Sequence, residues 1–187
     1  RHIDFAVGRG CEEVVRALIE AGVDVNKGYA GDGTTPLLFA FFNGHETVVL
    51  VLIEAGADVN TARNDGLTPL YRAAREGHEA MVRALIEAGA DINKASKKRG
   101  APLFIAAQNG HETVVQALIE AVADINKARD DGTTPLYIAT REGHEAVVRA
   151  LIEAAADINK KSYNGATPLH IAAQEGHETV VQALIEA

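Results

Sequence analysis

Residues Asp65 to Asn93 read DGLTPLYRAAREGHEAMVRALIEAGADIN, and this stretch recurs with edits along almost the whole chain. Its proline returns every 33 residues, at Pro36, Pro69, Pro102, Pro135 and Pro168. A Gly-His pair keeps the same step, at Gly44-His45, Gly77-His78, Gly110-His111, Gly143-His144 and Gly176-His177. An asparagine does so too, at Asn60, Asn93, Asn126 and Asn159. A fixed period of this length is typical of repeat proteins, in which one small unit is stacked many times.

Each repeat predicts two short helices. Thr68 can cap the first helix, and Pro69 suits its first position because no N–H is needed there. Gly77 ends this helix, since glycine adopts a left-handed conformation without a Cβ penalty. The second helix runs from about Glu79 to Ala88, and Gly89 closes it. Its apolar residues share one face at helical spacing: Met81, Val82, Leu85 and Ile86. The unit is therefore turn, helix, turn, helix and extended loop.

This unit resembles the ankyrin repeat. The matching residues are Gly66, Thr68-Pro69-Leu70, Ala73-Ala74, Gly77-His78, Val82, Leu85-Ile86 and Gly89-Ala90-Asp91-Ile92-Asn93. The resemblance covers nearly all of the 187 residues. It implies an all-α fold, an ankyrin-repeat solenoid of stacked helix-turn-helix units with β-turn fingers. About twelve short helices and no sheet are then expected. The resemblance also implies protein binding, because this family mostly binds other proteins and is rarely catalytic by itself.

The repeats predict one domain over residues 1–187, since each unit of a solenoid contacts only its neighbours. The expected units are approximately 1–26 (partial), 27–60, 61–93, 94–126, 127–159 and 160–187 (truncated). Four edits depart from the frame: Arg99 and Ala101 replace the turn glycine and the capping threonine, and Val122 and Ala155 replace cap glycines. Because HETVVQALIEA occurs at both 111–121 and 177–187, a 66-residue block has been copied. Recent natural duplication and consensus design both fit, and the four edits favour natural drift.

Composition excludes several classes of protein. No apolar run approaches the roughly 20 residues that span a bilayer, and residues 1–10 have no signal-peptide layout. The net charge of −8 argues against nucleic acid as a partner. Cys11 is the only cysteine, which rules out an internal disulfide and predicts a reducing, intracellular location such as the cytoplasm.

Neither the histidines nor Cys11 predict chemistry. Successive histidine copies are expected roughly 8–10 Å apart, too far to share a zinc ion, so each imidazole is interpreted as a hydrogen-bonding group between adjacent loops. Cys11 has no matching base to activate it. We therefore expect no enzyme activity, no metal and no cofactor. Arg72 stands where other repeats have an apolar residue, and its stem is expected to pack while its head reaches water or an acid.

The candidate binding residues are those that vary while the frame stays fixed. In ankyrin repeats these positions line the concave finger and inner-helix surface. In the fingers they are Asp32, Thr34, Asn64, Asp65, Leu67, Lys97, Lys98, Asp130, Asp131, Tyr163 and Asn164. At the ends of the first helices they are Asn43, Arg75, Glu76, Gln108, Asn109, Arg141, Glu142 and Gln174. The alternative is that these positions are merely unconstrained. Lys97 and Lys98 belong to a basic cluster that is either a solvated loop or a docking patch for an acidic partner.

The sequence thus predicts a non-enzymatic protein-protein interaction module whose protein partner it does not identify. Two alternatives remain: a designed or structural scaffold without a natural partner, and the targeting arm of a larger enzyme. The ends of the chain carry a further expectation. Ile3, Phe5 and Val7 at the start, and Val181 and Leu184 at the end, are expected to be exposed. Such faces indicate either that the chain is cut from a longer array or that it self-associates end to end.

Overall fold

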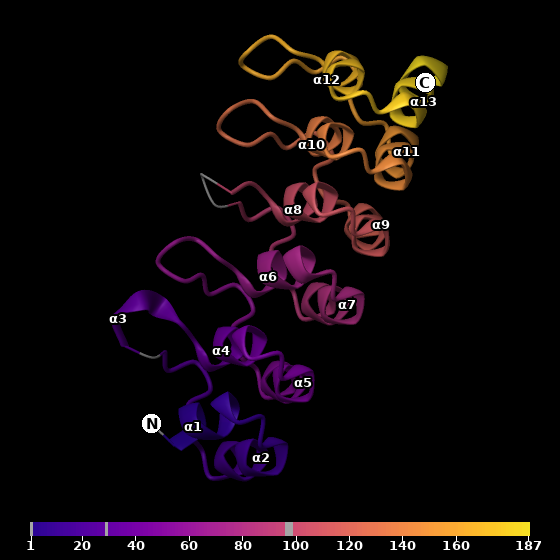
Figure 1. Ribbon diagram of the computed structural model, residues 1–187. Coiled ribbons are helices and arrows are strands. Elements are labelled where there is room, and N and C mark those ends of the chain that lie inside the picture. The colour runs from indigo at the N-terminus through magenta and orange to yellow at the C-terminus, as the bar shows by residue number, and fades with distance from the viewer. Residues whose placement is uncertain (1, 29, 96–98) are drawn as a thin grey trace. The chain divides into compact units, whose positions relative to one another are not determined.

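The computed structural model describes residues 2–28, 30–95 and 99–187 (Figure 1). These described residues form thirteen helices and no β-strand, so the all-α prediction is confirmed. The helices are α1 (His2–Gly8), α2 (Glu12–Glu20), α3 (Ala30–Gly33), α4 (Pro36–Phe42), α5 (Glu46–Glu54), α6 (Pro69–Glu76), α7 (Glu79–Glu87), α8 (Pro102–Gln108), α9 (Glu112–Glu120), α10 (Pro135–Arg141), α11 (Glu145–Glu153), α12 (Pro168–Glu175) and α13 (Glu178–Glu186). Twelve of them are the predicted pairs. The other, α3, is a helical turn between Asn26 and Pro36, a finger that is one residue longer than the finger between Asn60 and Pro69.

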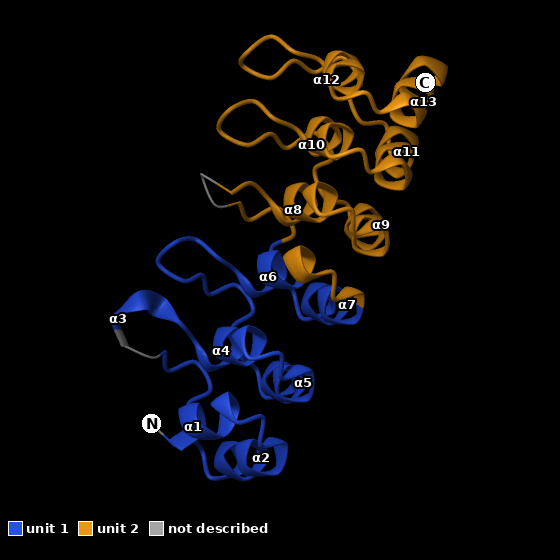
Figure 2. Cartoon of the chain, viewed as in Figure 1, with its two compact units in different colours: residues 1–73, 80–91 blue, residues 74–79, 92–187 orange. Residues whose placement is uncertain are grey.

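The chain divides into two compact units (Figure 2). The first comprises residues 1–73 and 80–91, and the second comprises residues 74–79 and 92–187. Both are built from the same repeat. In the first unit α1 contacts α4, and α2 contacts α5. In the second unit α10 contacts both α8 and α12, and α11 contacts both α9 and α13. First helices therefore stack on first helices, and second helices on second helices, within each unit.

The first helices begin as the Thr-Pro pairs predict. Thr35, Thr134 and Thr167 lie in extended backbone, and each side chain accepts a hydrogen bond from the N–H three residues on, at 3.2–3.3 Å. Ala101 has the same extended backbone before α8 but makes no side-chain cap. The predicted loss of this cap is confirmed.

The second helices end in a left-handed residue. Gly22, Gly56 and Gly89 have φ values of 80°, 79° and 84°. Val122 and Ala155 occupy the same position with φ values of 63° and 61°, and they are the only positive-φ residues other than glycine in the described chain. Val122 and Ala155 thus keep the left-handed backbone of the glycines that they replace. This conformation is strained for a residue with a Cβ.

Two repeated polar side chains tie neighbouring repeats together. The Nε2 atoms of His144 and His177 each lie 3.0 Å from a carbonyl oxygen near the end of the preceding first helix. The histidines were predicted to play this structural role, and the hydrogen bonds confirm it. The repeated asparagine adds a second link: Asn93 Oδ1 accepts from Asp124 N at 2.9 Å, and Asn126 Oδ1 accepts from Asp157 N at 2.8 Å.

The core also corrects part of the expectation about the ends. Ile3 and Val7 are 3% and 0% exposed, and Leu184 is 6% exposed, so these three are core residues. Val181 is half-buried. The sequence shows which residues of a helix are apolar, but it does not show whether an apolar residue faces its own repeat or faces outward. Of the predicted set only Phe5, at 68%, is strongly exposed.

Candidate protein-binding surface

The fingers are closed by backbone hydrogen bonds that fix where their tips lie. In the second unit Arg129 N donates to Thr133 O at 2.9 Å, and Ser162 N donates to Ala166 O at 3.0 Å. The two fingers are joined because Tyr163 N donates to Asp131 O at 3.1 Å. Side chains at these tips are therefore held on an ordered backbone.

In four of the fingers, an acidic or amide residue at the start of the turn supports the turn itself. Asp131 Oδ1 accepts from Thr133 N at 3.1 Å, and Asn164 Oδ1 accepts from Ala166 N at 3.1 Å. Asp32 and Asp65 make the same bond in the first unit. A carboxylate that accepts hydrogen bonds is stabilised in its charged form. The Arg129 hydrogen bond, followed by those from Thr133, lowers the pKa of Asp131, while the bonds from Thr34 lower the pKa of Asp32. These four variable positions thus have a structural role.

Two finger arginines were missed by the sequence reasoning. Arg63 pairs with Asp65 at 2.7 Å, and Arg129 pairs with Asp131. The Arg129 guanidinium also lies over the Phe104 ring, 5.0 Å from its centroid. The available signal was the Arg-x-Asp spacing at 63–65 and 129–131.

Arg72 makes a related contact in the first unit. Its guanidinium lies over the Phe42 ring at 5.2 Å, and Arg63 lies over the same ring at 5.5 Å. The prediction that the head of Arg72 reaches water or an acid did not include this aromatic contact. A cation over an aromatic face is favourable, which explains how arginine replaces an apolar residue here.

Tyr163 is the most prominent side chain of the fingers. It is 81% exposed, although its backbone is fixed by the hydrogen bond to Asp131. Its ring lies against Gly132, where a Cβ would approach Tyr163 Cδ1 to 2.6 Å. Because Gly132 has no side chain, the Tyr163 ring can pack against the backbone of the neighbouring finger. Tyr163 thus presents a large aromatic surface from a hydrogen-bonded backbone.

The ends of the first helices supply polar groups. Arg141 pairs with Glu142 at 2.8 Å, and Arg75 pairs with Glu76 at 3.3 Å. Asn109 Nδ2 donates to Arg75 O at 2.8 Å, so this side chain is used within the second unit. Asn43 bonds to the Phe39 carbonyl in the first unit. Gln108 is half-buried and Gln174 is exposed.

One pocket of the second unit brings two predicted residues together. It has a volume of about 260 Å³. The finger residues Asn164, Gly165 and Ala166 line it together with Tyr137, His170, Ile171 and Gln174 from α10 and α12. Asn164 and Gln174 were predicted, whereas Tyr137 and His170 were missed. These two follow the proline by two residues, a position that also varies in type between repeats.

Two of the predicted residues are too deeply buried to contribute to this surface. Thr34 and Leu67 are 7% and 4% exposed, so their side chains are not available to a partner. Both follow a turn glycine and point into the base of the finger. Lys97 and Lys98 lie outside the described residues. Asp130, in contrast, is exposed on the finger that precedes Tyr163.

The described residues offer neither a metal site nor a membrane span. Within residues 2–28, 30–95 and 99–187 no group of three or more histidine, cysteine or acidic side chains could hold a metal ion. No helix of that described part has the length and apolar character needed to cross a membrane.

The repeat geometry agrees with a comparison to known proteins. The family model for ankyrin repeats (3 copies) matches residues 3–96 and 103–187. The chain belongs to the ankyrin repeat family. A crystal structure of an ankyrin repeat protein, EF0377, superposes with a TM-score of 0.93 at 27% identity, covering 99% of this chain and 96% of that one. No curated protein matches the sequence. The predicted fold and family are therefore confirmed. Ankyrin repeats are generally non-enzymatic protein-protein interaction modules.

Proposed function

We propose that this ankyrin repeat chain is a non-enzymatic interaction module that binds a protein partner on its fingers and on the ends of its first helices. The observation that carries the proposal is Tyr163, an aromatic ring that is 81% exposed on a hydrogen-bonded finger. Binding energy at protein interfaces is concentrated in a few residues, among which tyrosine is enriched. An ordered backbone under the ring also lowers the conformational entropy that is lost when a partner covers it.

The residues around Tyr163 fit the same role. The pocket of Tyr137, Asn164, His170 and Gln174 lies on the finger that carries Tyr163 and on the helices behind it. It combines aromatic surface with hydrogen-bonding groups, which is the mixture found at interaction surfaces. Because Asp131 and Asn164 have structural roles within their turns, we assign the partner-facing role to Tyr163, Asp130, His170 and Gln174.

Site-specific photocrosslinking tests this proposal. A benzoyl-phenylalanine replaces Tyr163 or, in a separate variant, Gln174, and each chain is irradiated in extract of its source cells. We expect both variants to crosslink the same protein. The matched control carries the probe at Gln116, an exposed residue of the second helix α9. We then expect Tyr163→Ala to weaken binding of that protein by about ten-fold or more, since hot-spot tyrosines contribute about 2 kcal/mol. Equal crosslinking from Gln116, or full binding by Tyr163→Ala, would contradict the proposal.

A further inference from the structure

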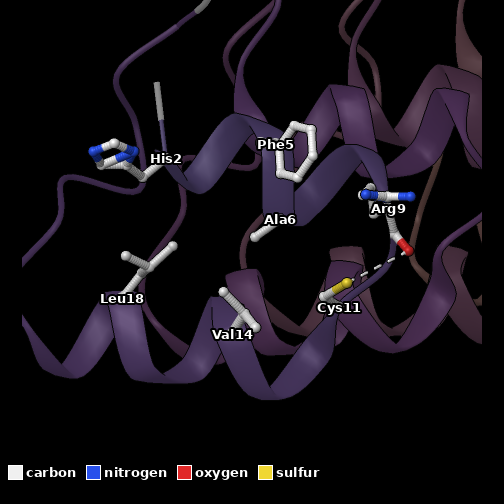
Figure 3. A pocket seen from close by; sticks show the side chains of 7 residues that line it. All are labelled: His2, Phe5, Ala6, Arg9, Cys11, Val14 and Leu18. Carbon is white, nitrogen blue, oxygen red and sulfur yellow. Dashed lines mark hydrogen bonds between the residues drawn. The ribbon is translucent and has the colours of Figure 1, made fainter.

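Arginine side chains of this chain lie over aromatic rings of its first helices. In the first unit the guanidinium of Arg9 lies 5.2 Å from the centroid of the Phe5 ring of α1, and both residues line the pocket shown in Figure 3. In the same unit the guanidinium of Arg63 lies 5.5 Å from the centroid of the Phe42 ring of α4. An aromatic face attracts a cation. The rings of the first helices are therefore places where this fold holds a guanidinium group.

The second unit shows how a finger supplies that group. The guanidinium of Arg129 lies 5.0 Å from the centroid of the Phe104 ring, which belongs to the first helix of the preceding repeat. The same guanidinium pairs with Asp131, which lies in the same finger turn. The Phe104 side chain is 0% exposed. The arginine, the aspartate and the ring thus fill the junction between two consecutive repeats.

The next junction of the same unit keeps the aromatic ring but not the ion pair. One repeat further along the chain, the positions of the ring, the arginine and the aspartate hold Tyr137, Ser162 and Asn164. Ser162 Oγ lies 3.2 Å from the Ala166 carbonyl oxygen, so this short side chain bonds within its own turn. In the described part of the chain, no arginine lies over the Tyr137 ring. The position that Arg129 occupies in one junction has no such occupant in the next.

A pocket lies at this place. Its volume is about 260 Å³, below the roughly 300–1,000 Å³ of sites for whole small molecules, so its size suits a single side chain. Tyr137 lines it from α10, His170 and Gln174 line it from α12, and Asn164 lines it from the finger. Tyr137 is 6% exposed, whereas Phe104 is 0% exposed. Because α10 and α12 belong to successive repeats of the second unit, the pocket lies at an internal junction of the stack.

The groups around the pocket favour a cation. Among the described residues, no lysine or arginine lines the pocket. Gln174 Nε2 donates to the Glu175 carboxylate at 3.0 Å, and because a carboxylate only accepts, the Gln174 oxygen Oε1 is directed away from it and can accept from a bound group. The chain carries a net charge of −8. Asn164 offers no ion pair of the kind that Asp131 forms, so a cation is held here less tightly than Arg129 is held in the preceding junction.

We propose that the protein partner inserts an arginine side chain into this pocket, with its guanidinium over the Tyr137 ring. The proposal rests on the proposed function, for which it names the chemistry of the partner. The guanidinium takes the place over Tyr137 that Arg129 takes over Phe104, and it donates to Gln174 Oε1. Lysine fits less well, because its ammonium is more strongly hydrated and is not planar. Tyr163, on the same finger, contacts the partner beside its arginine.

A variant whose own side chain fills the pocket tests the proposal. Ser162→Arg combined with Asn164→Asp copies the Arg-x-Asp turn of the preceding finger. We expect the introduced arginine to cover Tyr137, so this double variant should unfold at a urea concentration at least as high as that of the parent. The probe is a Gly-Arg-Gly peptide with blocked ends, added at millimolar concentration to the isotope-labelled chain. NMR should show saturable shifts of the Gln174 side-chain amide in the parent and none in the double variant.

Two further comparisons test whether the charge of the guanidinium is the cause. Asn164→Asp alone leaves the pocket open and supplies a carboxylate, so it should tighten binding of the peptide by about five-fold, which corresponds to about 1 kcal/mol for an ion pair. Citrulline has a shape similar to that of arginine but no charge, and a peptide that carries it should bind about ten-fold more weakly. Equal binding of the two peptides, unchanged binding by the double variant, or no saturable shift in the parent overturns the proposal.

The protein partner gives a separate test. A partner that is captured through Tyr163 should bind the double variant about ten-fold more weakly than it binds the parent. Full binding of that partner by the double variant, together with weak binding by Tyr163→Ala, would overturn the arginine proposal and leave the interaction surface standing. Because the peptide assay needs no partner, the two proposals can fail independently.

Discussion

At the scale of single residues, the two non-glycine caps offer a direct test of backbone strain. Val122 and Ala155 have φ values of 63° and 61°, and Val122 is 83% exposed. A Cβ added at Gly22, Gly56 or Gly89, the same position in other repeats, meets nothing within 4 Å. The Val122 and Ala155 side chains therefore gain no stabilising contacts with neighbouring atoms. Their main effect on stability is the free-energy cost of the left-handed backbone.

We expect Val122→Gly and Ala155→Gly each to raise the free energy of unfolding by about 1 kcal/mol, after allowing for the greater chain entropy of glycine. Urea denaturation at equilibrium measures the change. Val122→Ala is the control, since it removes the branched side chain but keeps a Cβ and should recover only part of the gain. If both glycine variants unfold at the same urea concentration as the parent, left-handed strain is not a significant cost here.

A second residue-scale prediction compares two buried threonines of one helix. Thr140 is 0% exposed, and its Oγ1 has no hydrogen-bond partner among the described residues. Thr134 is 1% exposed, and its Oγ1 caps α10 by accepting from Tyr137 N at 3.2 Å. Valine has the shape of threonine without the hydroxyl. Thr140→Val should stabilise the chain by about 1 kcal/mol, because a buried hydroxyl without a partner is costly.

Thr134→Val is the matched opposite case, and it should destabilise the chain by about 1 kcal/mol through loss of the cap. Thermal and urea unfolding of the two variants measure both values. Opposite signs are the result expected. Two losses of similar size would mean that the Thr140 hydroxyl is satisfied by a group such as buried water.

Burial and partner choice could not be derived from residue type alone. Thr34 and Leu67 vary between repeats and were expected at the surface, yet both are buried. Variation shows that a position accepts several side chains, but it does not show which way the side chain points. The Arg129–Asp131 pair and the stacking of Arg129 on Phe104 join residues whose approach depends on the folded finger.

At the scale of the element, the repeat pattern predicted most helix limits because it rests on local chemistry. The Thr-Pro starts and the glycine ends are satisfied within a few residues of the chain. The short helix α3 was not predicted, since Gly31 within it has a φ of 33° and no helix-forming pattern marks the segment. Gly100 has a φ of 82°, so it adopts the left-handed turn conformation one residue later than the other turn glycines, next to the edit at Arg99.

The cap missing from α8 gives a prediction at this scale. Ala101 has φ and ψ values of −83° and 167°, close to the −91° and 166° of Thr134. A threonine can therefore cap α8 without a backbone change. Ala101→Thr should raise the free energy of unfolding by about 1 kcal/mol. Ala101→Val is the control because it adds the same volume without an acceptor. Equal effects of the two substitutions in urea denaturation would assign the change to packing and not to capping.

At the scale of the whole molecule, the chain contains its own controlled comparison. Residues 111–121 and 177–187 have the same sequence, and they form α9 and α13 within one compact unit. Their surroundings differ. Ile119 of α9 is half-buried and lines a groove with Ala150 and Ala154 of the next repeat, whereas the equivalent Ile185 of α13 is 64% exposed. Local propensity is identical in the two helices, so any difference between them comes from their neighbours.

In a stacked repeat, stability is the sum of a term for each repeat and a term for each contact with a neighbour. We therefore expect the backbone amides of α13 to exchange with deuterium at least about ten-fold faster than the same amides of α9, which corresponds to about 1.4 kcal/mol of lost contact. Peptide-resolved hydrogen exchange at low protein concentration makes the comparison. Equal exchange in α9 and α13 at low concentration would show that sequence within the helix, and not its place in the stack, sets its stability.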